Sequence, residues 1–226
     1  MLSNFDAQQF AAAVKQLAYD ALSQPHHDAG LAAVRQIQQF SEETSPHLIG
    51  EDHFIDCRAG CAHCCIVNVA VLQPEADSIA GYLLENKTAE ELLDLYQYIC
   101  NLEKETSCLD DEERIMARKK CAFLDSEENC GIYPVRPLLC RAVTSTDVNA
   151  CIEALAMIAF GENRPIVSNL LQREIFETAF SSFGQALEKY GRDKRSNRLT
   201  ASVRIILDKK LNSGIHHENP RGTNVN

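Results

Sequence analysis

The sequence of 226 residues contains no tryptophan, and only nine phenylalanines and six tyrosines supply aromatic side chains. Alanine, leucine, isoleucine and glutamate are abundant instead, which favours helices. No apolar run approaches the ~20 residues that a membrane-spanning helix needs. Residues 1–6 also lack the basic region, apolar stretch and small-residue cleavage site of a secretory signal. We therefore expect a cytoplasmic protein that does not associate with a membrane.

Several catalytic signatures are missing as well. The sequence has no glycine-rich phosphate loop, no Gly-x-Ser-x-Gly and no His-Glu-x-x-His. The familiar patterns of nucleotide-binding proteins, serine hydrolases and zinc proteases are therefore absent. No single cysteine stands beside a base in the way that a thiol protease requires. Catalysis, if there is any, must use another kind of centre.

Positive charge is scarce overall, since the net charge is −10, and this disfavours binding to nucleic acid. The segment 189–210 is an exception, with eight Lys or Arg against two Asp. We expect a basic helix there and a protein partner that docks on it, and the alternative is an ordinary solvated helix face.

Cysteine is plentiful, with ten in the chain. Four of them occur in the run Cys57-Arg58-Ala59-Gly60-Cys61-Ala62-His63-Cys64-Cys65, which we call the first knuckle. A second knuckle has the spacing Cys121-x8-Cys130-x9-Cys140, and Cys151 follows ten residues later in the helical stretch beyond it. Disulfide frameworks belong to secreted chains, whereas clustered cysteines in a reducing compartment indicate a metal. Thiolates this close also repel one another unless a cation is bound.

The apolar periodicity indicates a mainly α fold with at most short β pieces. We expect a single helical domain over residues 1–211, a metal-binding core at about 55–151, and a disordered tail at 212–226. Ser45-Pro46 is expected to end the second helix, and Thr88 and Glu91 to form a capping box. The expected helices span residues 2–22, 31–40, 74–85, 88–105, 110–120, 147–160, 169–190 and 195–211, and the expected extended pieces span 66–72, 121–124 and 131–133.

Eight cysteines are candidate metal ligands: Cys57, Cys61, Cys64, Cys65, Cys121, Cys130, Cys140 and Cys151. Arg136 and Arg141 flank Cys140, and a guanidinium can lower the pKa of a thiol or donate hydrogen bonds to a ligating sulfur. Ordinary surface ion pairs are the alternative for both arginines. Tyr133 is expected to shield one side of the centre. Cys100 and Cys108 lie outside both knuckles, and we expect them not to bind metal.

Both knuckles, with Cys121-Ala122-Phe123-Leu124, Cys130-Gly131-Ile132-Tyr133 and Arg136-Pro137-Leu138-Leu139-Cys140-Arg141, resemble the bacterial CxxCxxCC cysteine-cluster family. That family is described as zinc- or iron-chelating proteins, and flagellin lysine N-methylases are related to it. The resemblance covers about residues 55–145 and implies metal binding without fixing a reaction. Glycine often follows the second cysteine in that family, whereas this chain has Ala62, so the turn there is expected to differ slightly.

The spacing Cys57-x3-Cys61-x2-Cys64 equals that of radical S-adenosylmethionine enzymes, whose three thiolates hold a [4Fe–4S] cluster. The chain lacks the alternating strands of their barrel, so we do not expect that fold. A helical protein could still carry such a cluster for redox or group-transfer chemistry. The number of thiols favours an iron–sulfur centre, and a structural zinc site with four ligands is the alternative. Whether the protein is an enzyme stays open.

Overall fold

The computed structural model describes residues 5–26, 28–49, 55–158, 160–162, 164 and 166–215. This part of the chain is mainly helical, as the sequence predicted. Its one sheet has two short antiparallel strands, β1 (Ala70–Val71) and β2 (Asn197–Arg198), with Ala70 opposite Arg198. Within the described ranges, no helix combines the length and apolarity needed to cross a bilayer.

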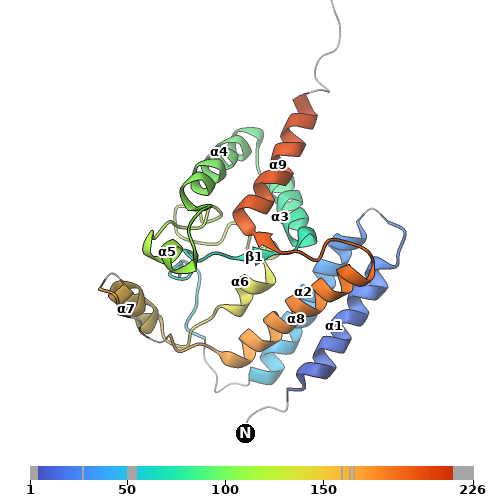
Figure 1. Cartoon of the computed structure of the whole chain (residues 1–226), viewed down its shortest axis with the longest axis horizontal. Coiled ribbons are helices and arrows are strands. Elements are labelled where there is room, and N and C mark those ends of the chain that lie inside the picture. The colour runs from blue at the N-terminus through green and yellow to red at the C-terminus, as the bar shows by residue number, and fades with distance from the viewer. Residues whose placement is uncertain are drawn as a thin grey trace, which may run out of the picture.

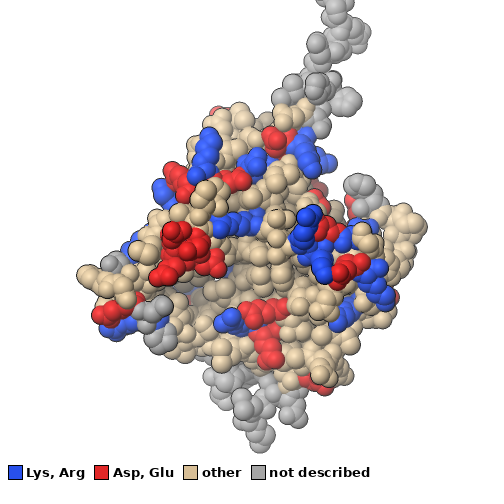
Figure 2. Space-filling view, in the orientation of Figure 1, with Lys and Arg blue, Asp and Glu red and all other residues tan. Residues whose placement is uncertain are grey.

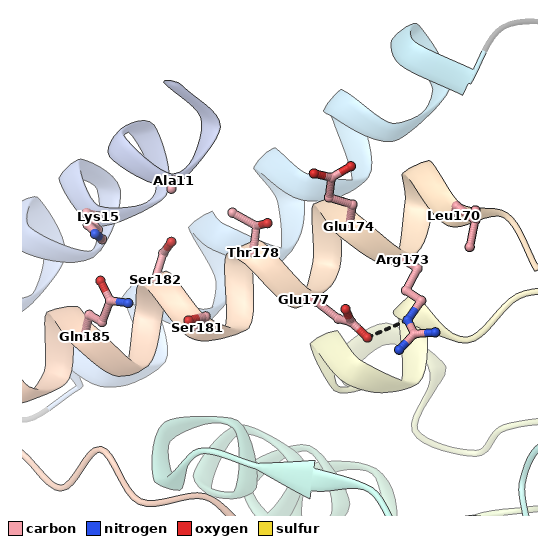
Figure 3. Close-up of a pocket in the computed structure, with 10 residues that line it drawn as sticks. All are labelled: Ala11, Lys15, Leu170, Arg173, Glu174, Glu177, Thr178, Ser181, Ser182 and Gln185. Atoms are coloured by element: carbon pink, nitrogen blue, oxygen red, sulfur yellow. Dashed lines mark hydrogen bonds and ion pairs between the residues drawn. The ribbon is translucent and has the colours of Figure 1, made fainter. Parts of the chain in front are cut away.

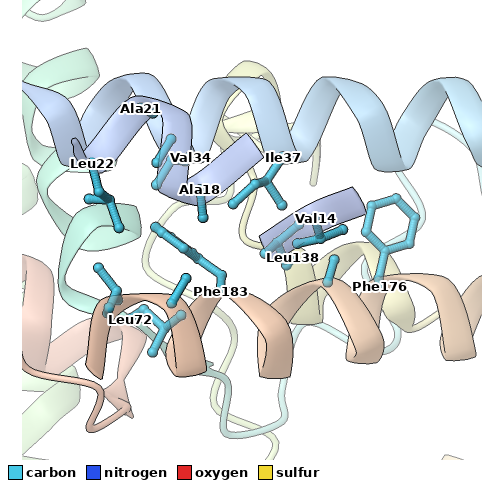
Figure 4. Packing of buried hydrophobic residues seen from close by; sticks show 14 of the residues in the cluster. Val14, Ala18, Ala21, Leu22, Val34, Ile37, Leu72, Leu138, Phe176 and Phe183 are labelled. Carbon is cyan, nitrogen blue, oxygen red and sulfur yellow. The ribbon is translucent and has the colours of Figure 1, made fainter. Parts of the chain in front are cut away.

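Three helices form a bundle at one end of the molecule (Figure 1): α1 (Ala7–Leu22), α2 (Ala29–Ile49) and α8 (Leu170–Lys189). Asp6 caps α1 by accepting hydrogen bonds from the backbone N–H groups of Gln8 and Gln9 at 2.9 Å. The apolar faces meet in a close-packed core around Phe183, with Leu72 and Leu138 reaching in from the neighbouring segments (Figure 4). This core is continuous with the elements that carry the cysteines.

A second group contains α3 (Gln73–Asn86), α4 (Ala89–Thr106) and α9 (Leu199–Ile215). The capping box of α4 is confirmed, because Thr88 Oγ1 accepts from the Glu91 N–H and the Glu91 carboxylate accepts from the Thr88 N–H. Their core includes Phe123 and Ile132 from the second knuckle, with Cys121, Cys130 and Cys140 packed against it. The cysteines therefore belong to the packing of this half.

Short elements connect the two groups: α5 (Asp111–Met116), the 3-10 turn η1 (Tyr133–Val135), α6 (Leu138–Ala142) and α7 (Val148–Ile158). Helix α6 packs on α8 and on β1, so it joins both cores. Helix α7 lies at the outer edge of the molecule (Figure 1). The side chain of Ile152 on α7 is exposed, and so is that of Phe160 just after it.

Three sequence predictions need correction. Helix α2 continues through Ser45-Pro46 to Ile49; a proline in the last turn removes one backbone donor, and the loss of one hydrogen bond does not end a helix of 21 residues. The extended piece at 66–72 shrinks to β1. Residues 212–215 of the expected tail belong to α9, and the rest of that tail lies outside the described residues.

The basic segment 189–210 is not one helix. Gly191, with φ at +66°, follows the end of α8, and β2 comes before α9. Several of its charges are bound within the chain: Lys189 lies over the Tyr19 ring, and ion pairs join Lys194 to Glu188, Arg195 to Asp193 and Arg204 to Glu103. Acidic and basic side chains are interspersed on the face shown in Figure 2. A protein partner on this segment stays a prediction.

Candidate metal centre

The first knuckle is a succession of tight turns. Cys61 N–H donates to Arg58 O at 3.0 Å, and Cys65 N–H donates to Ala62 O at 3.0 Å. Gly60 has a φ of +78°, a conformation that residues with a Cβ rarely adopt. The glycine therefore allows the chain to reverse between Cys57 and Cys61.

The second knuckle is built around a polar turn. Asp125 Oδ1 accepts from the backbone N–H groups of Glu127 and Asn129 at 2.9 and 2.8 Å, and Leu124 forms an isolated antiparallel bridge with Cys130. The Gly131 N–H donates to Phe123 O at 2.7 Å, and a Cβ at Gly131 would lie only 3.1 Å from that oxygen. Backbone hydrogen bonds thus hold the turn that follows Cys121 against the segment that begins at Cys130.

The two knuckles meet directly. The Cys121 N–H donates to Cys65 O at 2.7 Å, which joins residues 56 positions apart. Between and around the knuckles lies a cavity of about 830 Å³. Seven of the ten cysteines line it: Cys57, Cys61, Cys64, Cys65, Cys121, Cys130 and Cys140. The fold therefore brings onto one cavity wall the thiols that the sequence places in two separate groups.

Arg136 also lines this cavity, and its guanidinium interacts with thiols of both knuckles. Burial alone would lower the pKa of Arg136, but the nearby sulfurs of Cys140, Cys64 and Cys130 outweigh that effect and raise it. The guanidinium also donates to Cys140 O, which fixes the side chain. A permanent cation thus lies among the candidate ligands.

The thiols are not equivalent. Burial raises the pKa of Cys121 to about 11 and raises that of Cys140 further. The pKa of Cys64 is lowered, mainly by a hydrogen bond from the Cys65 thiol and also by Arg136, and the same hydrogen bond raises the pKa of Cys65. Deeply buried thiols keep their protons unless a metal cation replaces them.

The donor set fits a thiophilic metal. All ten cysteines are free, and the cavity wall offers more sulfur donors than the four that zinc takes. Across the described residues, no three His, Cys, Asp or Glu side chains converge closely enough to hold a metal ion as they stand. Metal binding would require the cysteine side chains to turn toward a common point in the cavity.

The remaining predicted ligands and their neighbours take other positions. Cys57 lies at the edge of the cavity, where the Ser145 N–H donates to its sulfur at 3.3 Å. Cys151 interacts with Cys57 from α7 but does not line the cavity. Cys100 and Cys108 do not line it either.

Arg141 and Tyr133 differ from Arg136 in what they contact. The Arg141 side chain turns away from the cavity, where it forms an ion pair with Glu42 and donates to the carbonyl oxygens of Arg136 and Tyr133. The Tyr133 ring lines the cavity but is 61% exposed, so it forms part of the rim. Arg141 therefore braces the loop that carries Arg136.

Three further arginines line the cavity, and none was predicted from the sequence as a site residue. Arg58 belongs to the first knuckle, whereas Arg114 on α5 and Arg198 on β2 lie outside both knuckles. The charged run around Arg114 has the pattern of a solvated helix, and Arg198 lies in the basic segment far along the chain. No pattern in the neighbouring sequence distinguishes Arg114 and Arg198 from arginines on the protein surface. Only the packing of α4, α5 and α9 around the knuckles brings them to the cavity.

A second hollow, of about 460 Å³, lies between α1 and α8 (Figure 3). Its lining is polar, and Arg173 Nε and Glu177 Oε1 pair across one turn of α8 at 2.7 Å. No cysteine lines this groove. The chemistry-bearing residues are therefore concentrated in the first cavity.

Fold and site together define a helical protein whose two cysteine knuckles face one cavity. Residues 56–158 match the model of the CxxCxxCC family, described as a "putative zinc- or iron-chelating domain". The resemblance seen in the sequence is thus confirmed over these residues. Searches of curated proteins and of solved structures find no match. Zinc or iron chelation is therefore the property that the family gives to this centre.

Proposed function

We propose that the protein binds an iron–sulfur centre through the cysteines of both knuckles and that this centre supports redox or group-transfer chemistry. The observation that carries the proposal is the gathering of seven free thiols on the wall of a single cavity. Iron–sulfur clusters are held by cysteine thiolates, commonly four for each cluster. We include group transfer because the knuckles resemble the CxxCxxCC family, to which flagellin lysine N-methylases are related.

The surroundings of the thiols support a charged cluster. A cluster with four thiolate ligands is anionic, and Arg136 places a buried cation among the sulfurs of Cys64, Cys130 and Cys140. Hydrogen bonds and positive charge near the sulfurs are among the features that set the reduction potential of such clusters. When bound, the cluster would supply electron transfer or an open iron site. The chain would hold it, shield it with Phe123 and Ile132, and balance its charge.

A structural zinc site is the second candidate, and the irregularity of the knuckles favours it. Residues 117–132 contain no helix and no strand apart from the bridge between Leu124 and Cys130. A closed site of four cysteines stabilises small irregular segments by on the order of 10 kcal/mol. In this case the protein would act through a partner, and its metal would only fix the knuckles.

The test is the metal content and absorption spectrum of protein purified without oxygen. A brown protein that absorbs broadly near ~400 nm and contains iron and sulfide would support the iron–sulfur centre. A colourless protein with stoichiometric zinc would contradict it and leave the structural site. Protein that retains neither metal would contradict both.

Substitutions of cysteine assign the ligands. We expect Cys61→Ser and Cys130→Ser to lose most of the bound metal, because each removes a thiol of the cavity wall. Cys108→Ser is the matched control, since Cys108 is exposed and does not line the cavity. Retention of metal in both knuckle variants would contradict the assignment of the site.

A further inference from the structure

The cavity has a cationic wall that the cysteines do not form. Arg114 and Arg198 line it together with the first turn of α9, on elements outside both knuckles. The cavity of about 830 Å³ falls in the range of pockets that enclose small organic molecules. It therefore has room for a ligand next to a metal centre.

The two arginines have no carboxylate partner among the described residues. Arg114 is 5% exposed, and Arg198 is half-buried. Backbone carbonyls hold them in place instead: Lys119 O accepts from Arg114, and Thr106 O accepts from Arg198 at 2.7 Å. Ser107 O and Leu109 O also accept from Arg198. These bonds orient the guanidinium groups, and the carbonyls at the end of α4 offset part of the charge of Arg198, but no carboxylate pairs with either arginine.

The carboxylates in the cavity lining do not supply the missing negative charge. Glu103 pairs with Arg204, and Glu128 pairs with Lys120. Burial and the proximity of Arg198 lower the pKa of Arg114, while the Cys121 thiol acts in the opposite direction. Like charges at one wall of a cavity repel each other unless an anion lies between or beside them.

Helix α9 adds to the positive electrostatic potential at the part of the cavity lined by the two arginines. It begins at Leu199, and Thr200 and Ala201 of its first turn line the cavity. The first turn contains no acidic residue. The N–H groups at a helix N-terminus have no partners within the helix and favour an anion. This helix of 17 residues therefore directs the positive end of its dipole toward the same wall as the two arginines.

An apolar surface connects this wall with the thiols. Phe123, Ile132 and Leu199 line the cavity and are otherwise buried. A ligand that binds across it would combine one anionic group with an apolar body. Carboxylate and phosphate groups both match the forked donors of arginine.

We propose that Arg114, Arg198 and the first turn of α9 bind the carboxylate or phosphate of a small organic molecule whose apolar part extends toward the cysteines. The proposal deepens the proposed function, because it assigns the class of substrate that would meet the metal centre. Anion binding itself depends only on the arginine wall, so it can be measured separately from the metal.

Calorimetric titration of the purified protein with inorganic phosphate, and with acetate in a parallel series, tests this site. We expect saturable binding of at least one of the two anions, and the stronger one identifies the preferred group. Arg198→Gln should weaken that binding roughly tenfold or more, because it removes a charged donor. Arg195→Gln is the matched control, since that exposed arginine pairs with Asp193 and does not line the cavity.

A second variant keeps both arginines, so that loss of anion binding can be distinguished from misfolding. Thr200→Glu places a carboxylate in the first turn of α9, where it suits the helix dipole and should keep the fold. We expect this variant to abolish anion binding with little change in melting temperature. The proposal is overturned if neither anion saturates, if Arg195→Gln and Arg198→Gln weaken binding equally, or if Thr200→Glu binds as the parent does.

The two proposals fail in distinguishable ways. Arginine-dependent anion binding by a protein without iron and sulfide would contradict the iron–sulfur centre and support the anion site. An iron–sulfur protein that binds neither anion would support the centre and contradict the anion site.

Discussion

Arg136 is the arginine whose positive charge interacts with thiols of both knuckles. Its guanidinium is buried among sulfurs of both knuckles, and its side chain is fixed by the carbonyl of Cys140. Arg141, five positions along, donates to Arg136 O at 2.8 Å and pairs with Glu42. One arginine therefore faces the candidate ligands, and the other holds the first in position.

We expect Arg136→Gln to weaken metal retention by about 10- to 100-fold, the usual effect of removing a group that contacts metal ligands. Competition with a chelator measures this change. With an iron–sulfur centre, the reduction potential should also move to more negative values, because loss of a nearby cation disfavours the added electron. Arg173→Gln on α8 serves as a control, and equal metal loss in both variants would contradict the role of Arg136.

Glu75 is a buried carboxylate at the junction of two helices. Its oxygens accept from the backbone N–H of Leu72 at 3.0 Å and of Leu138 at 2.9 Å, which ties the start of α3 to that of α6. Burial raises its pKa to about 7, although both hydrogen bonds and the nearby Arg141 act in the opposite direction.

The raised pKa of Glu75 predicts a pH dependence of stability. Folding favours the protonated form, so its contribution is present below the ordinary pKa of 4.5 and is lost as pH rises through about 7. We expect the free energy of unfolding to fall by on the order of 3 kcal/mol across this window. Denaturant titrations at several pH values measure it. Glu75→Gln should remove this slope, whereas the slope should persist in Glu85→Gln, whose side chain is exposed.

At the level of elements, the knuckles rely on contacts with segments far away in the chain. The Asp56 N–H donates to Ser145 O at 2.9 Å, and Asp56 Oδ2 accepts from the Val148 N–H at 2.9 Å. Asp147 is the capping residue of α7, the helix that carries Cys151, because its Oδ1 accepts from the Asn149 and Ala150 N–H groups. Asp56, the residue before the first knuckle, adds a second acceptor to this cap. Helix α7 lies at the edge of the molecule, so this cap is a main link between it and the cysteines.

We expect Asp56→Ala to lower the free energy of unfolding by about 1 kcal/mol, because the Val148 N–H at the start of α7 loses its side-chain acceptor. Asp56→Asn keeps a side-chain oxygen and should retain most of the stability. Denaturant unfolding followed by circular dichroism measures both. An effect of Asp56→Asn as large as that of Asp56→Ala would indicate that the charge of Asp56, rather than the cap, is important.

At the scale of the whole molecule, the described residues form two hydrophobic cores, and cysteines pack against one of them only. The core of α1, α2 and α8 contains none of them among its described residues, whereas Cys121, Cys130 and Cys140 pack against the core of α3, α4 and α9. Loss of metal should therefore affect the two halves unequally.

Hydrogen exchange measures this difference. We expect removal of the metal to increase amide exchange in the second knuckle and in α3, α4 and α9, with little change in α1 and α8. The reason is that no cysteine belongs to the first core, to which the knuckles contribute only Leu138. Equal loss of protection in both halves would show that they unfold as a single unit.

Much of the helical fold could be predicted from local patterns. The capping box at Thr88 and Glu91 and the turn between Asp125 and Asn129 follow from interactions within a few residues. The end of α2 was wrong because the local effect of Pro46 is small in a last helical turn. A break between the helices at 190 and 195 was expected in the basic segment, whereas the pairing of β2 with β1 was not, because it joins segments far apart in the chain.

The sequence by itself determined the cysteine spacing, the family of the domain and the chemistry of its donors, because these depend on the identity and order of residues within each knuckle. Tertiary structure alone decided that seven thiols share one cavity, that Arg136 rather than Arg141 faces them, and that Arg114 and Arg198 line the same cavity. These facts depend on contacts between segments tens of residues apart, such as the hydrogen bond from Cys121 N–H to Cys65 O. Local patterns carry no information on such contacts, because packing of whole helices brings them about.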